Sequence, residues 1–412
     1  MAMFEKADRS AKKPSFIIDD SDILLKRMQE GDVVFFTGAG FSKSWNDNYP
    51  LGFDLFRIDK ETPKMNIFNV ADSIHIYQPQ REDEIVEKEN IKNKLKEQLE
   101  YFKMSLNQTH SKNIELIINN FDRHLRLKTK IKDEASNNID YRYKKECYNY
   151  FKEIKFSLDV FKRYPSLIPN HLDKTIIRKM EVEIKNFVKD KFKTLVGEDE
   201  LNIKSKKDIN MDFVVFFKNL YLKNKNTTFI STNYDYIIEK IYYHIDEKIV
   251  INRGAIEHRI FDEKAWEKSP ISLYKINGGF DVFYKSDSEF YINHDKKKED
   301  PNIIIPSNDQ DYSDKYFKNV FIKSANKLRE ANTLVFIGYS LPDEDNIIKF
   351  LIKNFVDTSN TNKEIIIISR DLESAKLIKE KVDIIFPILK GNDAIKIFTK
   401  SFNDFIKDCS NL

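Results

Sequence analysis

The stretch VVFFTGAGFS, residues 33–42, decides the fold of this chain. Its first four residues are β-branched or aromatic, and the run stops abruptly at two glycines, Gly38 and Gly40. An unbroken apolar run of this kind is typical of a parallel strand that is buried on both faces. Glycines directly after it indicate a loop whose backbone must come close to a ligand. The stretch therefore predicts a strand at residues 33–36 with a ligand-binding loop after it.

Three further strand ends carry similar chemistry. Gly278 and Gly279 end the run LYKINGGFD, Gly338 ends the run in TLVFIGYSLPDED, and NTTFISTNYD ends in small polar residues. Because the carboxyl ends of parallel strands meet at one edge of a sheet, we expect all four ends to lie near one another. Four such ends suggest a nucleotide site at the carboxyl edge of an open sheet.

The composition describes a soluble globular protein of two or so domains with a large core. Charged residues make up 33% and hydrophobic residues 41% of the 412 residues. The net charge of +3 is small for this length, so no direct nucleic-acid binding is expected. No stretch approaches 18 apolar residues, and residues 1–15 lack the apolar segment of a signal peptide. We therefore expect a cytoplasmic protein without a membrane partner.

The cysteines argue against two kinds of covalent or metal support. The chain has two, Cys147 and Cys409, which lie far apart and show no CxxC spacing. Neither a disulfide framework nor a structural zinc site fits this pattern. We expect no metal site.

A long segment without glycine interrupts the pattern, since no glycine occurs between Gly52 and Gly197. Much of this segment is rich in Lys, Glu and Asn, with bulky apolar residues at helical spacing. These residues form two stripes, Ile91, Leu95, Leu99, Phe102 and Leu106, and Ile114, Ile118, Phe121 and Leu125. Such stripes indicate the core-facing sides of helices rather than cofactor contacts. We predict a helical subdomain at 81–200, inserted between the two parts, 1–80 and 201–412, of one Rossmann-like domain.

An alternation of strands and helices follows from about residue 211. The predicted strands lie at residues 228–230, 248–251, 272–276, 333–337, 364–368 and 383–389. The predicted helices lie at residues 214–222, from 236 onward, and at 315–330, 373–381 and 393–406. Before the first strand, SDILLKRMQEGD predicts a short helix capped by Ser21 and stopped by Gly31. Strands separated by helices predict an α/β fold, a doubly wound (Rossmann-like), mostly parallel sheet covered on both faces.

The motif TGAGFS, residues 37–42, supplies small residues between a strand and a predicted helix. Gly38, Ala39 and Gly40 would let backbone N–H groups approach a pyrophosphate, and the start of the helix favours anions. The third glycine of the dinucleotide fingerprint is missing, so an ordinary Rossmann dehydrogenase is a poor match. Taken alone, the motif fits a tight strand-to-helix turn without a ligand equally well.

Two other motifs offer side chains at strand ends. In STNYD, Asn233 can donate and accept hydrogen bonds, which suits holding a carboxamide or a water molecule. Asp235 fits the simpler role of a cap for the next helix. In GYSLPDED, Gly338 permits close approach and Ser340 offers a hydroxyl to a ribose or phosphate, while Pro342 and the acidic residues after it would begin a helix.

The order GAGFS, TNYD, LYK-x-x-G and GYSLPDxD resembles that of the sirtuin-like NAD-cleaving domains found in bacterial anti-phage defence systems. The resemblance covers about residues 22–56 and 205–390. It rests on four motifs in this order and spacing, since no single motif is specific. The fold that it implies is a doubly wound sheet that binds NAD between itself and a helical subdomain.

The resemblance also implies roles for individual residues. The residues implied to surround the pyrophosphate and ribose are Gly38, Ala39, Gly40, Phe41 and Ser42. Asn233 would orient water near the nicotinamide ribose, and Asp235 would lie close to the carboxamide. The residues implied on the adenosine side are Gly338, Tyr339 and Ser340, with Ser369 at the end of the next strand as a further contact.

Two departures from the family pattern matter. Protein-deacylating sirtuins carry a zinc ribbon with paired cysteines, which this chain cannot build, so NAD cleavage is favoured over deacylation. Where the family usually has His-Gly, this chain has Asn277 followed by Gly278. An asparagine amide cannot act as a general base near neutral pH, whereas histidine can. Of the histidines near the motifs, His244 and His258 have core or surface roles as their simplest explanation.

The implied function is that of an NAD+ hydrolase acting in anti-phage defence by abortive infection, with NAD as its substrate. Asn277 leaves open two outcomes: a weakened or inactive enzyme, in which it replaces the histidine beside Asn233, or a non-catalytic subunit that binds NAD or ADP-ribose and assembles a defence complex. Fused members of the family carry a sensing domain at the carboxyl end, and this chain ends soon after the predicted fold, so we expect a separate sensor such as a HerA-like ATPase or a short Argonaute. We also expect a homo-oligomer.

Overall fold

The computed structural model describes residues 16–18, 20–59, 62, 65–79, 93–94, 97, 100, 139–224, 227–249, 251–254, 264, 271–286, 289–294, 299–307, 310–356, 363–390 and 393–410. The two predicted apolar stripes between residues 91 and 125 lie outside the described residues, and so does His258. The chain divides into two compact units. One comprises Met1–Leu51 and Ile184–Leu412, and the other comprises Gly52–Glu183.

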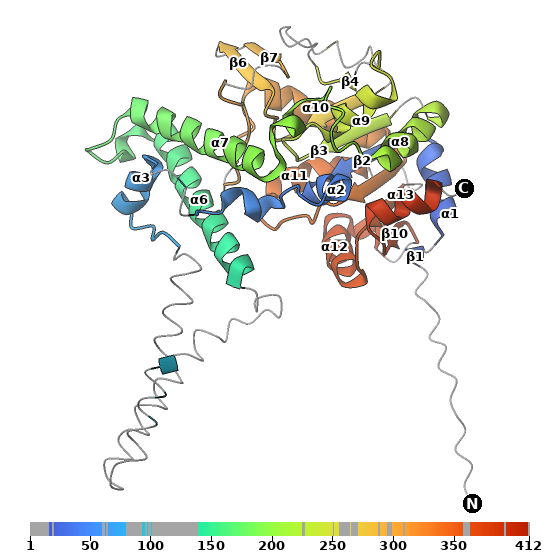
Figure 1. The fold of residues 1–412 in the computed structure, drawn as a ribbon, viewed down its shortest axis with the longest axis horizontal. Coiled ribbons are helices and arrows are strands. Elements are labelled where there is room, and N and C mark those ends of the chain that lie inside the picture. Colours follow the sequence, from blue (N-terminus) through green and yellow to red (C-terminus); the bar gives the residue numbers. More distant parts are fainter. Residues whose placement is uncertain are drawn as a thin grey trace, which may run out of the picture. The chain divides into compact units, whose positions relative to one another are not determined.

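The described part of the Gly52–Glu183 unit is helical (Figure 1). Its elements are η1 (Gly52–Phe56), α3 (Ile67–Ser73), α6 (Ile139–Arg163), η3 (Pro165–Leu167) and the first part of α7 (Lys174–Val196). The carboxylate of Glu183 on α7 accepts hydrogen bonds from the backbone N–H groups of Asn66 and Ile67, at 3.0 and 3.1 Å. It thus satisfies donors that the first turn of α3 leaves without an intrahelical partner. Helices α6 and α7 lie within the predicted insert, whose limits at 81 and 200 stay a prediction.

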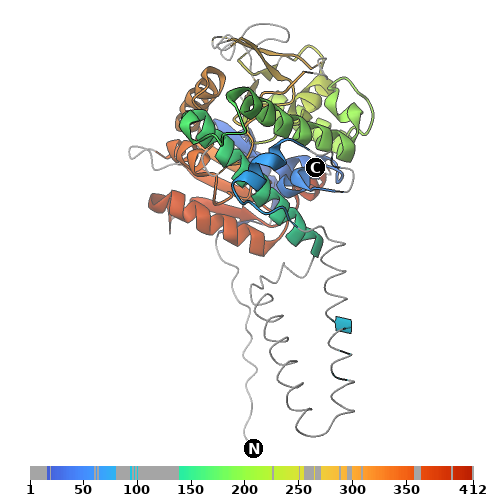
Figure 2. The ribbon, with the colours of Figure 1, turned by 90° about the vertical axis from the view of Figure 1, so that its left-hand side faces the viewer.

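In the other unit, eight described strands form one sheet in the order β1-β10-β9-β8-β2-β3-β5-β4, and every pairing in it is parallel. The strands are β1 (Ile17–Ile18), β2 (Val33–Thr37), β3 (Thr227–Ser231), β4 (Ile251–Asn252), β5 (Ile271–Lys275), β8 (Thr333–Ile337), β9 (Glu364–Ile368) and β10 (Ile395–Phe398). A separate antiparallel hairpin consists of β6 (Val282–Ser286) and β7 (Glu289–Ile292) (Figure 2). The predicted α/β fold with a parallel sheet is confirmed.

Helices cover both faces of this sheet, as the alternation along each strand requires. On β2, Val34 and Phe36 belong to a core shared with α10 (Lys315–Glu330), α11 (Asn346–Ile352) and α12 (Leu372–Ile385). The intervening Phe35 points to the other face, where its ring packs against Phe217 and Phe229. The helices that contact one another there are α1 (Ser21–Gln29), α2 (Ala39–Trp45), α8 (Met211–Lys223), α9 (Ile237–Ile245) and α13 (Phe402–Ser410).

Two predicted elements near the carboxyl end were wrong. The predicted strand at 383–389 is instead the end of α12 followed by η7 (Pro387–Leu389), because Ala375, Val382 and Ile385 share a buried helical face and Pro387 cannot continue the helix. The predicted helix at 393–406 begins as strand β10, which pairs with β9, and becomes helical only in α13. A short apolar run alone does not distinguish strand from helix.

Two smaller corrections concern helix starts and short strands. Asp20, and not Ser21, caps α1, since its carboxylate accepts from the backbone N–H groups of Asp22 and Ile23. The strand predicted at 248–251 is limited to Ile251–Asn252. The β6–β7 hairpin was not predicted, because its residues KSDSE give no glycine or asparagine turn signal.

Candidate functional site at the carboxyl edge of the sheet

The four motif-bearing strands are neighbours in the sheet, in the order β8-β2-β3-β5. The chain leaves β2 toward β3 on one side and leaves β8 toward β9 on the other. The strand order therefore reverses between β2 and β8, and ligands of open α/β sheets bind at the carboxyl side of such a reversal. The motifs predicted to converge at one edge do so.

The glycines at this reversal let two loops pack against each other. Gly338, after β8, has a φ of +63°, and a Cβ on it would lie 2.2 Å from the backbone nitrogen of Phe41. A Cβ on Gly40 would lie 2.7 Å from the Gly338 Cα, and the Gly40 N–H donates to the Gly338 carbonyl at 2.9 Å. The predicted reason for these glycines was approach to a ligand. Contact between the loops is sufficient to require them.

Two residues beside these glycines, Phe41 and Tyr339, have buried side chains. Phe41 is buried, and its ring packs against Phe213, Phe217 and Phe402, so only its backbone is available to a ligand. Tyr339 is also buried, with its ring against Phe36 and its hydroxyl donating to Asp345 at 2.7 Å.

Three of the predicted positions on this side lie nearer to solvent. Gly338 and Ser340 are exposed, and Ser369 is half-buried at the end of β9, two strands from β2. Ser340 and Ser369 thus have the accessibility that contact with a ligand needs.

Asn233, Ser42 and Asp235 form a compact hydrogen-bonded group. The Ser42 hydroxyl donates to the Asp235 carboxylate at 2.6 Å, and the Asn233 amide donates to the Ser42 hydroxyl at 2.8 Å. The same amide nitrogen donates to the Gly38 carbonyl at 2.9 Å. The loop after β3 is thereby tied to the start of α2. Asn233 is half-buried, so it is the member of this group that a ligand could reach.

The Asp235 carboxyl is buried, and burial raises its pKa above its ordinary value. The charge of Lys275 and the hydrogen bond from Ser42 act in the opposite direction. Its second oxygen accepts from the Ile237 N–H at 3.2 Å, at the start of α9. The cap role predicted for Asp235 thus coexists with the contact to Ser42.

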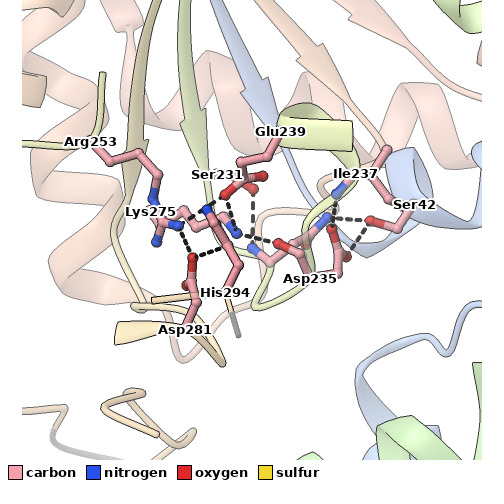
Figure 3. A network of polar contacts seen from close by, with 10 residues as sticks. Ser42, Ser231, Asp235, Ile237, Glu239, Arg253, Lys275, Asp281 and His294 are labelled. Atoms are coloured by element: carbon pink, nitrogen blue, oxygen red, sulfur yellow. Dashed lines mark hydrogen bonds and ion pairs between the residues drawn. The ribbon is translucent and has the colours of Figure 1, made fainter. Parts of the chain in front are cut away.

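A buried network of charges lies beside Asp235 (Figure 3). Lys275, the last residue of β5, donates to the backbone carbonyl of Asp235 and lies 2.9 Å from the Glu239 carboxylate. Glu239 also contacts Arg253 at 3.0 Å. The cation of Lys275, the lysine of the LYK-x-x-G motif, thus connects the end of β5 with the STNYD loop, a contact that the motif did not predict.

The network continues to the turn after β5. Arg253 contacts the Asp281 carboxylate, which also lies 3.0 Å from His294 Nδ1. Burial favours a higher pKa for Asp281, but Arg253 and His294 more than offset it and hold the pKa well below its ordinary value. A Cβ on Gly279 would lie 2.6 Å from an Asp281 oxygen. Gly279, the second glycine of the turn after β5, therefore leaves room for the ion pair between Arg253 and Asp281.

Asn277 lies in that turn, where its backbone and side chain are both held. Its carbonyl accepts from the Ile304 N–H at 2.9 Å. Its Nδ2 donates to the Thr232 carbonyl at 3.3 Å, and its Oδ1 accepts from the Tyr312 hydroxyl at 2.9 Å. Asn277 thus touches the loop that carries Asn233. Sequence reasoning missed Tyr312, which follows no strand end and belongs to no recognised motif.

No group of three or more His, Cys, Asp or Glu side chains within the described residues is placed to bind a metal ion. No described helix is both long and apolar enough to cross a membrane. His244, on α9, contacts the Ser205 carbonyl at 3.0 Å.

Comparison with known families adds one finding. Residues 227–385 match a family model described as "SIR2-like domain". The matched segment contains Asn233, Asp235, Asn277 and the loop after β8, and it supports a sirtuin-like domain in this chain. Such domains are generally NAD-dependent enzymes. No curated protein matches the chain.

Proposed function

We propose that this protein hydrolyses NAD+ at the bond between nicotinamide and ribose. The observation that carries the proposal is the group formed by Asn233, Ser42 and Asp235 at the reversal of strand order. It combines an accessible amide with a buried carboxylate at the edge where nucleotides bind to such sheets. The match to a SIR2-like domain over residues 227–385 supports the choice of NAD.

The pyrophosphate is assigned to the loop after β2. Gly38, Ala39, Gly40, Phe41 and Ser42 would surround it at the start of α2, where anions are favoured. The N–H groups of Gly38, Gly40 and Phe41 donate to backbone carbonyls and the Ser42 hydroxyl donates to Asp235, so these donors would have to exchange partners when the pyrophosphate binds. The adenosine side is assigned to Gly338, Tyr339 and Ser340, with Ser369 as a further contact. The exposure of Gly338 and Ser340 is compatible with this assignment.

The reaction needs a positioned dinucleotide, a stabilised sugar cation and a water molecule. The C–N bond to nicotinamide breaks, and its electron pair leaves with the nicotinamide ring. Asn233 orients the water that attacks the anomeric carbon, and the Asp235 loop contacts the carboxamide. The products are nicotinamide, ADP-ribose and one proton. Since Asn277 cannot accept that proton, water must take it, which costs about two to four orders of magnitude in rate.

The Asn277 amide also favours a second candidate function. Asn277 can keep its hydrogen bonds to Thr232 and Tyr312 and still donate its second Nδ2 hydrogen to a ligand, but it cannot accept a proton. A subunit that binds NAD or ADP-ribose and assembles a larger complex would need only this. Deacylation is not favoured, because two cysteines cannot build the zinc ribbon of deacylating sirtuins.

The biological role that we propose is that of an anti-phage effector. NAD loss would end the infection together with the host cell. We propose that the chain acts as a homo-oligomer with a separate sensor, such as a HerA-like ATPase. We also propose that residues 81–200 form a helical subdomain inserted into the NAD-binding domain.

Nicotinamide release from NAD by the full chain tests this function, alone and with the candidate sensor. We expect release to fall at least about 100-fold in Asn233→Ala, since water is no longer oriented. Asn326→Ala, on the exposed surface of α10, is the matched control and should keep full activity. NAD binding without any release in either form would favour the binding subunit, and absence of NAD binding would refute both candidates.

A further inference from the structure

Tyr312 joins Asn277 to a part of the chain that no motif marks. Its hydroxyl lies 2.9 Å from Asn277 Oδ1 and 3.1 Å from the side-chain oxygen of Gln310. Its ring packs on α10 against Phe317 and Phe321, with centroids 6.3 and 4.4 Å away. The phenol is thus buried and fixed from behind by α10.

The donor and the acceptor can be derived for each hydrogen bond in the series Thr232–Asn277–Tyr312–Gln310. The Thr232 carbonyl can only accept, so Asn277 must present Nδ2 to it. Oδ1 then faces Tyr312, which must donate its single hydroxyl hydrogen to it. The side-chain oxygen of Gln310, at 3.1 Å, is a second acceptor for the same hydrogen, and Asn277 Oδ1 is the nearer of the two. Burial raises the pKa of Tyr312 well above its ordinary value, so the phenol keeps its hydrogen.

The consequence concerns the second hydrogen on Asn277 Nδ2. A primary amide carries two donors, and only one is used by Thr232. Without Tyr312, only the 3.3 Å hydrogen bond to the Thr232 carbonyl would oppose a rotation of the amide that presents oxygen to a ligand. With Tyr312, it is held as a donor.

We propose that Tyr312 is a positioning residue that holds Asn277 as a hydrogen-bond donor to a hydroxyl oxygen of the nicotinamide ribose. The proposal rests on the proposed NAD site. It makes the pair Tyr312–Asn277 a determinant of specificity, which selects dinucleotides with an intact ribose over deoxyribose analogues.

Calorimetric titration of the full chain with NAD and with its 2′-deoxy and 3′-deoxy nicotinamide-ribose analogues tests this. We expect NAD to bind about tenfold more tightly than one of the analogues, the effect of one lost hydrogen bond to a buried donor. In Tyr312→Phe, the affinity for NAD should fall until it is within about threefold of the affinity for that analogue. The affinity of the variant for the analogue should equal that of the unaltered protein. A merely structural role would instead weaken the binding of all three ligands alike.

Tyr284→Phe is the matched control, since it removes a tyrosine hydroxyl that donates to Asp314, just before α10. It should leave the preference for NAD intact. If the unaltered protein binds NAD but shows no preference, or if Tyr312→Phe keeps the preference, the role of Tyr312 is refuted while the NAD site stands. If the unaltered protein does not bind NAD, the proposed function itself fails.

Discussion

The Ser42 hydroxyl donates a 2.6 Å hydrogen bond to the Asp235 carboxylate and so joins two segments 193 residues apart in the chain. The carboxylate is buried, and this bond compensates part of its lost hydration. Compensation is incomplete, since burial still raises the pKa of Asp235 above its ordinary value. The buried carboxylate therefore makes the stability of the fold depend on pH.

The first prediction gives the sign of that dependence. Because the pKa of Asp235 is raised in the folded state, its contribution to stability is full below the unfolded value of 3.8 and is lost as pH rises through the folded value. Asp235→Asn has no charge to bury at this position. As pH rises from the unfolded pKa of 3.8 through the raised folded pKa, the free energy of unfolding of the variant minus that of the unaltered protein should therefore increase.

Urea denaturation of both proteins at intervals from about pH 4 to about pH 8 measures this difference. A difference that stays constant with pH would show that Asp235 titrates normally. A difference that moves the other way would show that Lys275 and Ser42 outweigh the burial.

The second prediction concerns the contact between the loops after β2 and β8. Gly338→Ala must place a Cβ 2.2 Å from the Phe41 nitrogen at a φ of +63°, and we expect it to lose at least about 3 kcal/mol of stability. Gly52→Ala is the control, since a Cβ there meets nothing within 4 Å, and its stability should change by less than about 1 kcal/mol. Thermal and urea unfolding of both variants decide the matter. Equal stabilities would contradict the packing described here.

The third prediction separates two buried lysines with similar ion pairs. Lys275 and Lys240 each lie 2.9 Å from a glutamate, Glu239 and Glu200 respectively. Replacing either with methionine should cost about 3 kcal/mol or more, because a buried carboxylate loses a partner. Only Lys275 also holds the carbonyl of Asp235. Lys275→Met should therefore lower kcat for NAD cleavage further than Lys240→Met does, when both are assayed below their unfolding temperatures. Equal kcat values would assign Lys275 a purely structural role.

The parallel sheet could be predicted because its strands are apolar on both faces. Val33–Thr37 and Thr333–Ile337 read as continuous buried strands, and every residue in them is buried. The same signal fails at residues 383–389, where an apolar run on one face of a helix looks like a strand. The convergence of the four motifs at one edge of the sheet could also be predicted, because the carboxyl ends of parallel strands lie at the same edge.

The charged network and Tyr312 could not be predicted from the sequence. Lys275, Glu239, Arg253 and Asp281 come from four separate segments, and a buried charge looks like a solvated one until its partners are known. Tyr312 lies shortly before α10, which packs against β5, and its contact with Asn277 joins segments that are far apart in the sequence. One hint was present, because Lys275 ends an otherwise apolar strand, where an unpaired cation would be costly.

The most direct test of the NAD-cleaving site is the rate of nicotinamide release by Asn277→His in the full chain with its sensor. Imidazole Nδ1–H can take the place of Nδ2 and donate to the Thr232 carbonyl, and Tyr312 keeps Gln310 as an alternative partner. The other ring nitrogen is then free to accept a proton. We predict a rate about 100-fold above that of the unaltered protein, with little change in NAD affinity, and loss of the gain when Asn233→Ala is added. Equal rates for the histidine and asparagine forms would contradict the account.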